Sequence, residues 1–302
     1  MPSDDESVRT VGIALLANVG ILLAKLAAAV ITGTAALFAE TVHSAADTGN
    51  SLLLIVAQHR SSGPTAPSGL SRGREAYFWA LLAAIGVFVV GAVLAVYEGI
   101  RALLDPTPGE SFAVAYVVLA VAFGLDLVSF LRARRQLSSE AHVRARGLFE
   151  QVRLTSDPTT RAVFAEDSAA LVGNVIAATG IALQQVTGSA APDALASIGI
   201  GLVLGTVAVF LVERNRDFLV GQEVSPTGKE RIRSFIAAWP GVVAVRSLIA
   251  FFTGPDEILV VARVAIDESL DGADVEHLVT GIERELRAQE PSITRVDVVP
   301  TG

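Results

Sequence analysis

Four polar residues lie within one strongly apolar stretch of the chain, and two of them are spaced to share a helix face. The segment AALFAETVHSAADTGNSLLLIV carries Glu40, His43, Asp47 and Asn50. His43 and Asp47 are four positions apart, so a helix places them one turn apart on the same face, and Asn50 lies close to that face. An imidazole and a carboxylate at this spacing are two ligands of the kind that hold a divalent metal ion.

A second apolar segment, RAVFAEDSAALVGNVIAATG, carries a further pair of carboxylates, Glu166 and Asp167. Asn174 follows Asp167 by seven positions and shares its helix face, whereas Glu166 points about 100° away. An ionisable group in a membrane segment costs about 2.5–3.5 kcal/mol on insertion scales. The two segments are therefore expected to hold these groups for a function.

We predict a divalent-cation site between the two segments. Carboxylates offset the hydration that the ion loses, and a neutral imidazole favours zinc, cobalt or iron over magnesium. Zinc prefers about four ligands. The three predicted ligands are His43, Asp47 and Asp167, and the further candidates are Glu166, Asn174, Asn50 or water. The alternative is that these groups only hydrogen-bond one another and hold the helices together.

The facing carboxylates also predict proton exchange. Asp47 and Asp167 would repel each other without a metal ion, so at least one of them is expected to hold a proton. Metal binding would then release protons.

Other polar groups are expected to have ordinary roles. Glu40 lies nearer the outer end of its segment and is expected to be solvated. Lys25 and Asp126 are expected to pair or to extend towards the interface. His59 and His142 fall in predicted loops and are expected to be solvated.

The depths of the two acidic segments do not match by simple counting. Asp47 is about 12 residues, or about 18 Å, from the outer end of its helix. Asp167 is about 20 residues, or about 30 Å, from the outer end of its own. Helices that end at one surface would keep these carboxylates apart.

The composition indicates which elements position these residues. The chain has 302 residues, of which 52% are hydrophobic and only 18% charged, against about a quarter charged in soluble domains. A membrane-spanning helix needs about 20 apolar residues. We predict a mostly α membrane protein with six transmembrane helices in residues 1–212, at about 11–31, 35–57, 77–100, 112–131, 162–186 and 194–212.

Arginine placement predicts the orientation of the bundle. The loops after the second and fourth segments carry ten arginines, and the intervening loops carry no arginine or lysine. Basic residues gather on the cytoplasmic side, so both termini are expected to be cytoplasmic. The arginines are Arg60, Arg72, Arg74, Arg132, Arg134, Arg135, Arg144, Arg146, Arg153 and Arg161.

Residues 213–302 predict a small cytoplasmic α+β domain. Amphipathic helices are expected at 228–239 and 273–289, and β-branched strands at 242–252, 257–267 and 293–300. The order is α-β-β-α-β, which suits helices packed on one face of a sheet.

Several classes of function are disfavoured. The chain has no cysteine, so a thiolate metal site is excluded. Its net charge of −8 and the lack of a basic stripe argue against a nucleic-acid partner. Ser44 and Ser168 have no histidine arranged to activate them, so we expect no enzyme activity. No cofactor is expected apart from the metal ion as cargo.

Together the motifs resemble the cation diffusion facilitator family. The matching stretches are ALFAETVHSAADTGN, SRGREAYFWALLAAIGVFVVGAVLAVYEGI, AEDSAALVGNVIAATG and APDALASIGIGLVLG, so the resemblance covers nearly all of the chain. It is strongest to the subgroup with a Glu-Asp pair in span five. The resemblance implies metal ligands at His43, Asp47 and Asp167. The first member of the span-five pair, often histidine in zinc exporters, falls on Val163 here.

The resemblance further implies a homodimer in a lipid bilayer that exports a divalent metal ion, with zinc favoured, in exchange for protons. The plasma membrane is the expected location. Because Val163 removes one ligand, the alternative is a non-transporting metal sensor or partner subunit of the same fold. In the C-terminal domain the positions comparable to a regulatory metal site are Arg246 and Asp297. They include no histidine, and His277 is expected at the surface, so we predict a dimerisation domain without a strong metal site.

Overall fold

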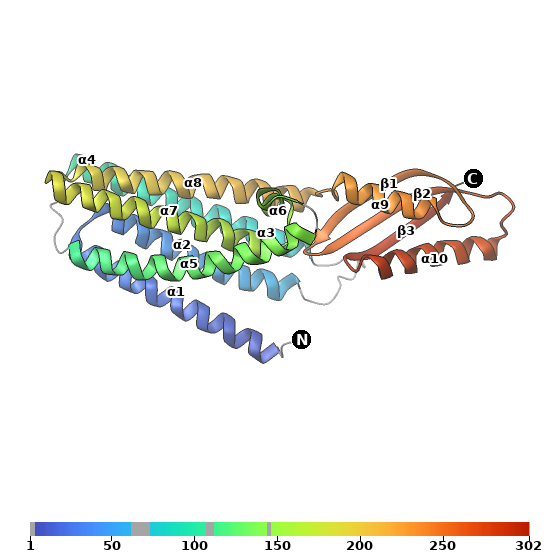
Figure 1. The fold of residues 1–302 in the computed structure, drawn as a ribbon, viewed down its shortest axis with the longest axis horizontal. Helices are drawn as coiled ribbons and strands as arrows, with labels where there is room; N and C mark the ends of the chain where they lie inside the picture. Colours follow the sequence, from blue (N-terminus) through green and yellow to red (C-terminus); the bar gives the residue numbers. More distant parts are fainter. Residues whose placement is uncertain (1–3, 62–72, 107–111, 144–145, 302) are drawn as a thin grey trace. The chain divides into compact units, whose positions relative to one another are not determined.

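The computed structural model describes residues 4–61, 73–106, 112–143 and 146–301, with the side chains of residues 4–17, 54, 57–59, 61, 87 and 143 left undescribed. Its helices are α1 (Asp4–Thr32), α2 (Ala35–Ser61), α3 (Arg74–Ala83), η1 (Ala84–Phe88), α4 (Val89–Leu104), α5 (Phe112–Val143), α6 (Leu148–Leu154), α7 (Pro158–Thr187), α8 (Ala191–Val220), α9 (Pro226–Ala237) and α10 (Gly272–Gln289). Its strands are β1 (Val242–Gly254), β2 (Glu257–Ile266) and β3 (Ile293–Thr301). Figure 1 labels them along the chain.

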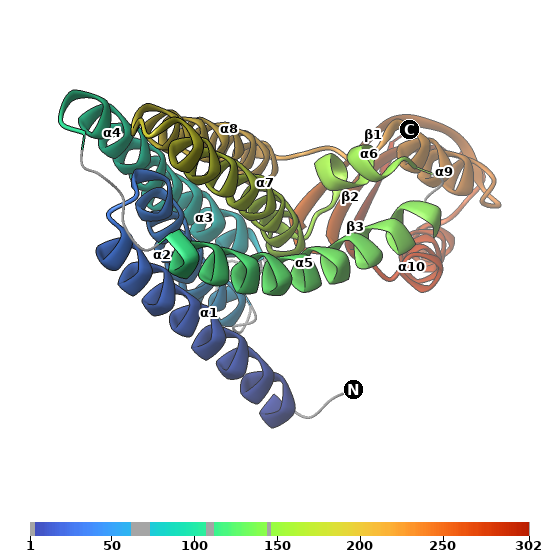
Figure 2. The ribbon, with the colours of Figure 1, turned by 60° about the vertical axis from the view of Figure 1, so that its left-hand side comes forward.

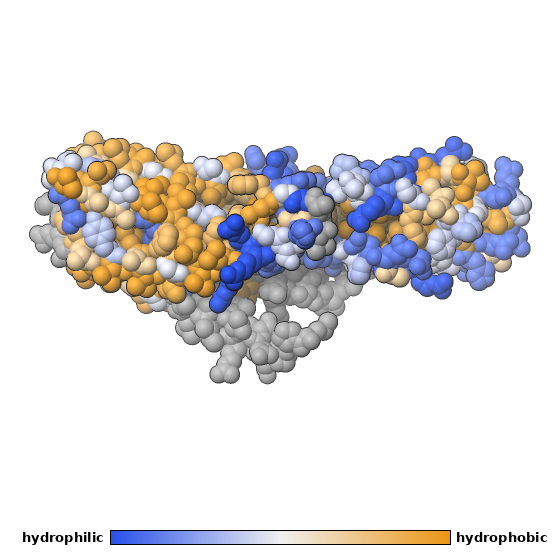
Figure 3. Space-filling model, in the orientation of Figure 1, coloured by the Kyte–Doolittle hydropathy of each residue, from blue (hydrophilic) through white to orange (hydrophobic). Residues whose placement is uncertain are grey.

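The chain forms two compact units. The helical unit contains the described residues up to Gln58 together with Trp79–Asn215, and the sheet unit contains His59–Phe78 together with Arg216 onwards. Figure 3 shows apolar residues over much of the visible face of the helical unit, and polar residues mixed with apolar ones over the sheet unit. Such an apolar exterior is typical of a surface that faces lipid.

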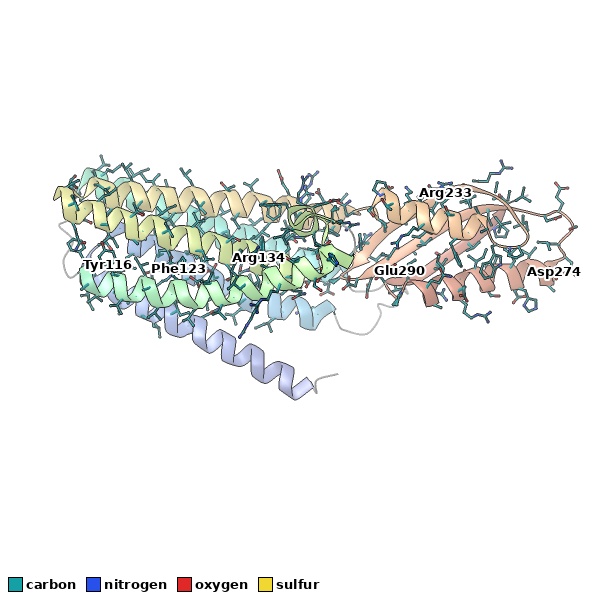
Figure 4. All side chains as sticks on the ribbon, viewed as in Figure 1. Tyr116, Phe123, Arg134, Arg233, Asp274 and Glu290 are labelled. Atoms are coloured by element: carbon teal, nitrogen blue, oxygen red, sulfur yellow. The ribbon has the colours of Figure 1, made fainter. Side chains whose placement is uncertain are left out.

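The helical unit has a core of small residues that lets its helices approach closely. Alanines make up most of the buried core, which also includes Leu37, Phe88 and Ile181. A Cβ on Gly201 of α8 would lie 2.7 Å from Val96 of α4, so only glycine fits there. In Figures 1 and 2, α7 and α8 run side by side. Tyr116 of α5, labelled in Figure 4, donates a hydrogen bond to Gln185 of α7 over 3.0 Å.

The protein is a multi-pass membrane protein. Among the described residues, four helices are long and apolar enough to cross a membrane: Arg74–Leu104, Phe112–His142, Pro158–Thr187 and Ala191–Val220. In α1, the residues with described side chains form a shorter apolar stretch, Asn18–Thr32. Helix α2 has the length of a span, but Glu40, His43, Asp47 and Asn50 interrupt its apolar surface. The predicted count of six spans therefore stays a prediction.

The connection after the fourth predicted span is more helical than expected. The sequence placed a loop after residue 131, but α5 continues to Val143 and the short α6 follows at Leu148–Leu154. Arg134, labelled in Figure 4, lies on this extension of α5 with Arg132 and Arg135. These arginines are good helix formers, so the helix continues beyond the apolar stretch.

The first turn of α2 is capped from a distant part of the chain. The Asp193 carboxylate, in the first turn of α8, accepts hydrogen bonds from the backbone N–H of Ala35 over 2.5 Å and of Ala36 over 3.2 Å. Asp193 is buried. The cap satisfies two backbone donors that a helix leaves unpaired at its start, and it fixes the beginning of α2 beside α8.

Replacing Asp193 with alanine is expected to lower the free energy of unfolding by about 1–2 kcal/mol, because it removes a helix cap. The measurement is the thermal unfolding of the protein purified in detergent. Thr187→Ala, at an exposed residue nearby, serves as the control and is expected to stay within about 0.5 kcal/mol of the parent. Equal stability of the two variants would contradict the role of this cap.

The sheet unit has the expected order of elements, with α9, β1, β2, α10 and β3 in sequence. Strand β1 pairs antiparallel with β2, and β2 pairs parallel with β3, so the sheet order is β1-β2-β3. Apolar residues of α9 and α10, such as Ile236 and Ile282, share one buried core with Ala250, Val260 and Val298 of the strands. Because strand residues alternate between faces, both helices cover the same face.

The start of α3 packs on the end of the β1–β2 hairpin. The Tyr77 ring stacks on Phe218 with centroids 5.1 Å apart, and Phe218 contacts Phe252 at 5.5 Å. A Cβ on Gly73 would lie 2.6 Å from the Cα of Gly254, and the same holds in reverse. The two backbones can therefore come this close only because both residues are glycine. The aromatic rings and this close approach make Gly73–Phe78 part of the sheet unit.

Candidate metal site

The predicted pair on α2 forms as the spacing requires. His43 Nε2 lies 2.9 Å from Asp47 Oδ2, with the His43 side chain 1% exposed and the Asp47 side chain 23% exposed. Despite this short distance, neither ring nitrogen of His43 has a hydrogen-bond partner among the described residues. The two side chains therefore converge without the alignment of an N–H donor and an acceptor. Two converging ligand atoms of this kind suit a shared metal ion.

Helix α7 presents its two carboxylates to different neighbours. Glu166 accepts a short hydrogen bond from the side-chain amide of Asn50 on α2. Asp167 instead accepts a hydrogen bond from the hydroxyl of Ser129 on α5. The angular offset of about 100° between consecutive helical residues explains this division.

Asn174 faces α5, on the same side of α7 as Asp167. Its side-chain amide donates to Asp126 Oδ2 over 3.0 Å and to the Ala170 carbonyl over 2.9 Å. The predicted shared face of Asp167 and Asn174 is thereby confirmed. Asn50 and Asn174, two of the further candidate ligands, already donate to carboxylates in this structure.

The depth mismatch between α2 and α7 does not arise in the folded helices. Asn50 meets Glu166, and Glu40 Oε1 lies against the Cα of Gly173, so the two helices run antiparallel with Asp47 level with Asp167. The difference in length falls at the other ends, where α7 continues past the level at which α2 begins. The two helices therefore do not end at the same level, which was the condition for the predicted mismatch.

The polar groups of α2, α5 and α7 form one electrostatic network. Asp167 interacts with Asp47, His43 and Asp126, and Glu166 interacts with Asp47 and His43. Within the described part of the chain, no three histidine, aspartate or glutamate side chains lie close enough together to hold a metal ion. The structure thus brings His43 and Asp47 together and places Asp167 within electrostatic range, without closing a three-ligand shell.

Several buried atoms in this network have unused hydrogen-bonding capacity. Among the described residues, Asp47 Oδ1, Asp167 Oδ2 and Asn174 Oδ1 have no hydrogen-bond partner. Buried polar atoms are rarely left unpaired in folded proteins. All three are oxygen acceptors, which a divalent cation satisfies.

The expectation of a solvated Glu40 was wrong. Glu40 is fully buried and forms an ion pair with Lys25 of α1, with Nζ 2.9 Å from Oε2. Lys25 is 1% exposed and pairs with Glu40 rather than with Asp126. Rotation of α1 towards α2 brings the two side chains together, and no local spacing in the sequence reveals this contact.

The contribution of α5 was missed. The sequence interpretation gave Asp126 a structural role and did not consider Ser129, yet these residues hold Asn174 and Asp167. The spacing of three positions between Asp126 and Ser129 places them on one helix face. That spacing, in an apolar segment, was the available signal.

Other predicted positions lie outside the network. Val163 is partly buried on α7, one turn before Asp167. His142 and His277 are exposed, as expected, and the side chain of His59 lies outside the described residues. In the sheet unit, Asp297 pairs with Arg295 at 3.3 Å.

Comparison with known families decides the identity of this fold. Residues 11–220 match the family described as the cation efflux transmembrane domain. This match covers more than half of the chain. The chain belongs to the cation efflux, or cation diffusion facilitator, family.

Named relatives of this cation efflux protein differ in how much of their own length the chain covers. It is 34% identical over 246 residues to the mitochondrial proton-coupled zinc antiporter SLC30A9 of Mus musculus, covering 80% of this chain and 43% of the relative. It is 31% identical over 237 residues to metal tolerance protein C4 of Arabidopsis thaliana, covering 78% of this chain and 51% of the relative. The chain thus spans about half the length of these curated relatives. The cation-efflux pump FieF of Escherichia coli is 27% identical over 83% of this chain and 78% of the relative.

Proposed function

We propose that this protein exports a divalent metal ion, with zinc as the preferred ion, in exchange for protons. The observation that carries the proposal is the convergence of His43 and Asp47 beside Asp167, with acceptor atoms that are buried and unpaired among the described residues. The relatives named as zinc antiporters and cation efflux pumps support the same reaction. The protein acts as a transporter and not as an enzyme, and needs no resident cofactor.

The proposed ligands are His43, Asp47 and Asp167, with Glu166, Asn174, Asn50 or water completing the shell. For Asp167 to join His43 and Asp47 on one ion, its carboxylate has to turn from Ser129 towards α2. A rearrangement of this size is compatible with a site that opens alternately to the two sides. Protons that neutralise the carboxylates in the absence of metal are released when the ion binds.

We propose six spans, with α1 and α2 joining the four apolar helices, and both termini on the cytoplasmic side as the arginines indicate. The plasma membrane is the proposed location. Because some relatives carry the word mitochondrial in their names, the location of a fluorescently tagged protein in cells decides between the two membranes.

We propose that a second copy of the chain covers the open face of the sheet. Ile249 is 49% exposed and Val299 is 42% exposed on the face opposite the two helices. Ile249 pairs with Val261 across β1 and β2. The mass of the detergent-purified protein by light scattering tests this dimer, and a monomeric mass would contradict it.

The transport proposal is tested in sealed vesicles that contain the full-length protein and a trapped dye that responds to each of the divalent ions offered. Zinc, manganese, iron and cobalt are offered with and without a proton gradient. We expect zinc flux that rises when protons move in the opposite direction and falls when a protonophore removes the gradient. Zinc flux that ignores the gradient would refute antiport. Zinc binding without flux would favour the non-transporting sensor or partner subunit, for which the lack of a closed three-ligand shell among the described residues is the supporting observation.

A further inference from the structure

A buried ion pair borders the metal site. Lys25 on α1 and Glu40 on α2 are 1% and 0% exposed, and their charged atoms are 2.9 Å apart. Two charges removed from water are costly to keep even when paired. Ionisable residues inside membrane helices are rare and usually mark functional positions. The pair therefore calls for an explanation beyond packing.

The pair is part of the same polar face as the predicted ligands. Glu40 precedes His43 by three positions on α2, and its second oxygen, Oε1, which has no hydrogen-bond partner among the described residues, lies against Gly173 of α7. Lys25 interacts electrostatically with Asp47 and with Asp126. A positive charge thus lies within electrostatic reach of a proposed metal ligand.

The charge on Lys25 opposes the binding of a divalent cation. In a medium of low polarity, a unit charge about 10 Å from a divalent ion changes its binding constant by tenfold or more. Transport needs a site that binds the ion strongly enough to load it and weakly enough to release it. Without Lys25, the uncompensated Glu40 would add a fifth negative charge to four neighbouring carboxylates and slow the release of the ion: Asp47, Asp126, Glu166 and Asp167.

We propose that Lys25 is a tethered counter-charge that cancels the attraction of the buried Glu40 carboxylate for the metal ion, so that the ion can be released, and that Glu40 holds the Lys25 ammonium group in place. This inference rests on the proposed function and adds two positioning residues to it. Neither residue contacts the ion. Lys25 acts through the field at the site, and Glu40 acts through Lys25 and through its own negative charge.

The test is the dissociation constant for Zn²⁺ of the full-length protein in detergent, measured by competition with a chromophoric chelator. Lys25→Met is expected to bind Zn²⁺ about tenfold or more tightly and to transport it more slowly, because release is impeded. Glu40→Gln is expected to bind Zn²⁺ about tenfold or more weakly. The double variant, in which both charges are removed, is expected to return to within about threefold of the parent, because the pair has no net charge.

Opposite shifts in the two single variants separate an electrostatic role from a structural one. Loss of packing alone would weaken binding in both, and that result would overturn the inference. Leu37→Ala is the matched control, since Leu37 is fully buried on α2 one turn before Glu40 and carries no charge. It is expected to lower stability and leave the Zn²⁺ affinity unchanged.

Single variants leave one buried charge unpaired and can fail to fold. In that case the swapped pair, Lys25→Glu with Glu40→Lys, keeps the ion pair and moves the positive charge to α2, one turn from His43. It is expected to bind Zn²⁺ about tenfold or more weakly, and an unchanged affinity would overturn the inference. If the parent protein itself binds no Zn²⁺, the proposed function fails instead.

Discussion

Zinc transport is expected to fall by about a hundredfold or more when Asp47 is replaced with asparagine. Even residues that only orient metal ligands change affinity or activity by about 10–100-fold, and Asp47 is a proposed ligand 2.9 Å from His43. Asparagine has nearly the same shape but lacks the negative charge that offsets the lost hydration of the ion. The measurement is the initial rate of zinc uptake into vesicles that contain the full-length protein.

The control for this variant is Glu98→Gln, which makes the same chemical change on α4. Glu98 pairs with the exposed Arg101 of the same helix at 3.2 Å. We expect its transport rate to stay within about twofold of the parent. A transporting Asp47→Asn variant would show that the carboxylate on α2 is dispensable, and the proposed ligand set would have to be abandoned.

The largest expected loss of stability comes from a single methyl group at Gly173. A Cβ there would overlap Glu40 Oε1, which is fully buried, so the carboxylate that pairs with Lys25 would have to shift. Inserting a methyl group into a packed core costs about 1–3 kcal/mol. Gly173→Ala is therefore expected to lower the free energy of unfolding by about 1–3 kcal/mol, measured by thermal unfolding in detergent.

The direction of the stability change distinguishes Gly173 from a glycine in open space. Alanine is a better helix former than glycine by about 0.5–1 kcal/mol, so in open space the same substitution stabilises a helix. Gly124 of α5 offers that control, because a Cβ there would meet nothing within 4 Å. Gly124→Ala is expected to be neutral or slightly stabilising. Equal behaviour of the two alanine variants would mean that Glu40 can relocate without penalty.

Local spacing was sufficient to predict the part of the site that lies on one helix. His43 and Asp47 meet because residues four apart share a face, and Glu166 and Asp167 separate because consecutive residues do not. The strands and helices of residues 213–302 were also readable, since their apolar residues alternate with period two or recur every three to four positions.

Contacts between helices were not accessible in the same way. The partner of Lys25 depends on how α1 is rotated against α2, and the role of Asp126 depends on which face of α5 meets α7. The sequence shows which polar residues are present, but it does not show how each helix is rotated about its own axis against its neighbours. The long-range cap from Asp193 to Ala35 was missed for the same reason, because it joins positions 158 residues apart.

The stacking of Tyr77 on Phe218 bears on how the molecule can be divided. A fragment that begins near residue 213 would contain Phe218 but not Tyr77 or Gly73. It would expose to water the aromatic ring of Phe218 and the backbone at Gly254 that Gly73 covers. Such a fragment is therefore expected to be less stable than the same residues in the full chain. Helices α3 and α8 each contain residues of both units, so the sheet unit is joined to the helical unit by two continuous helices.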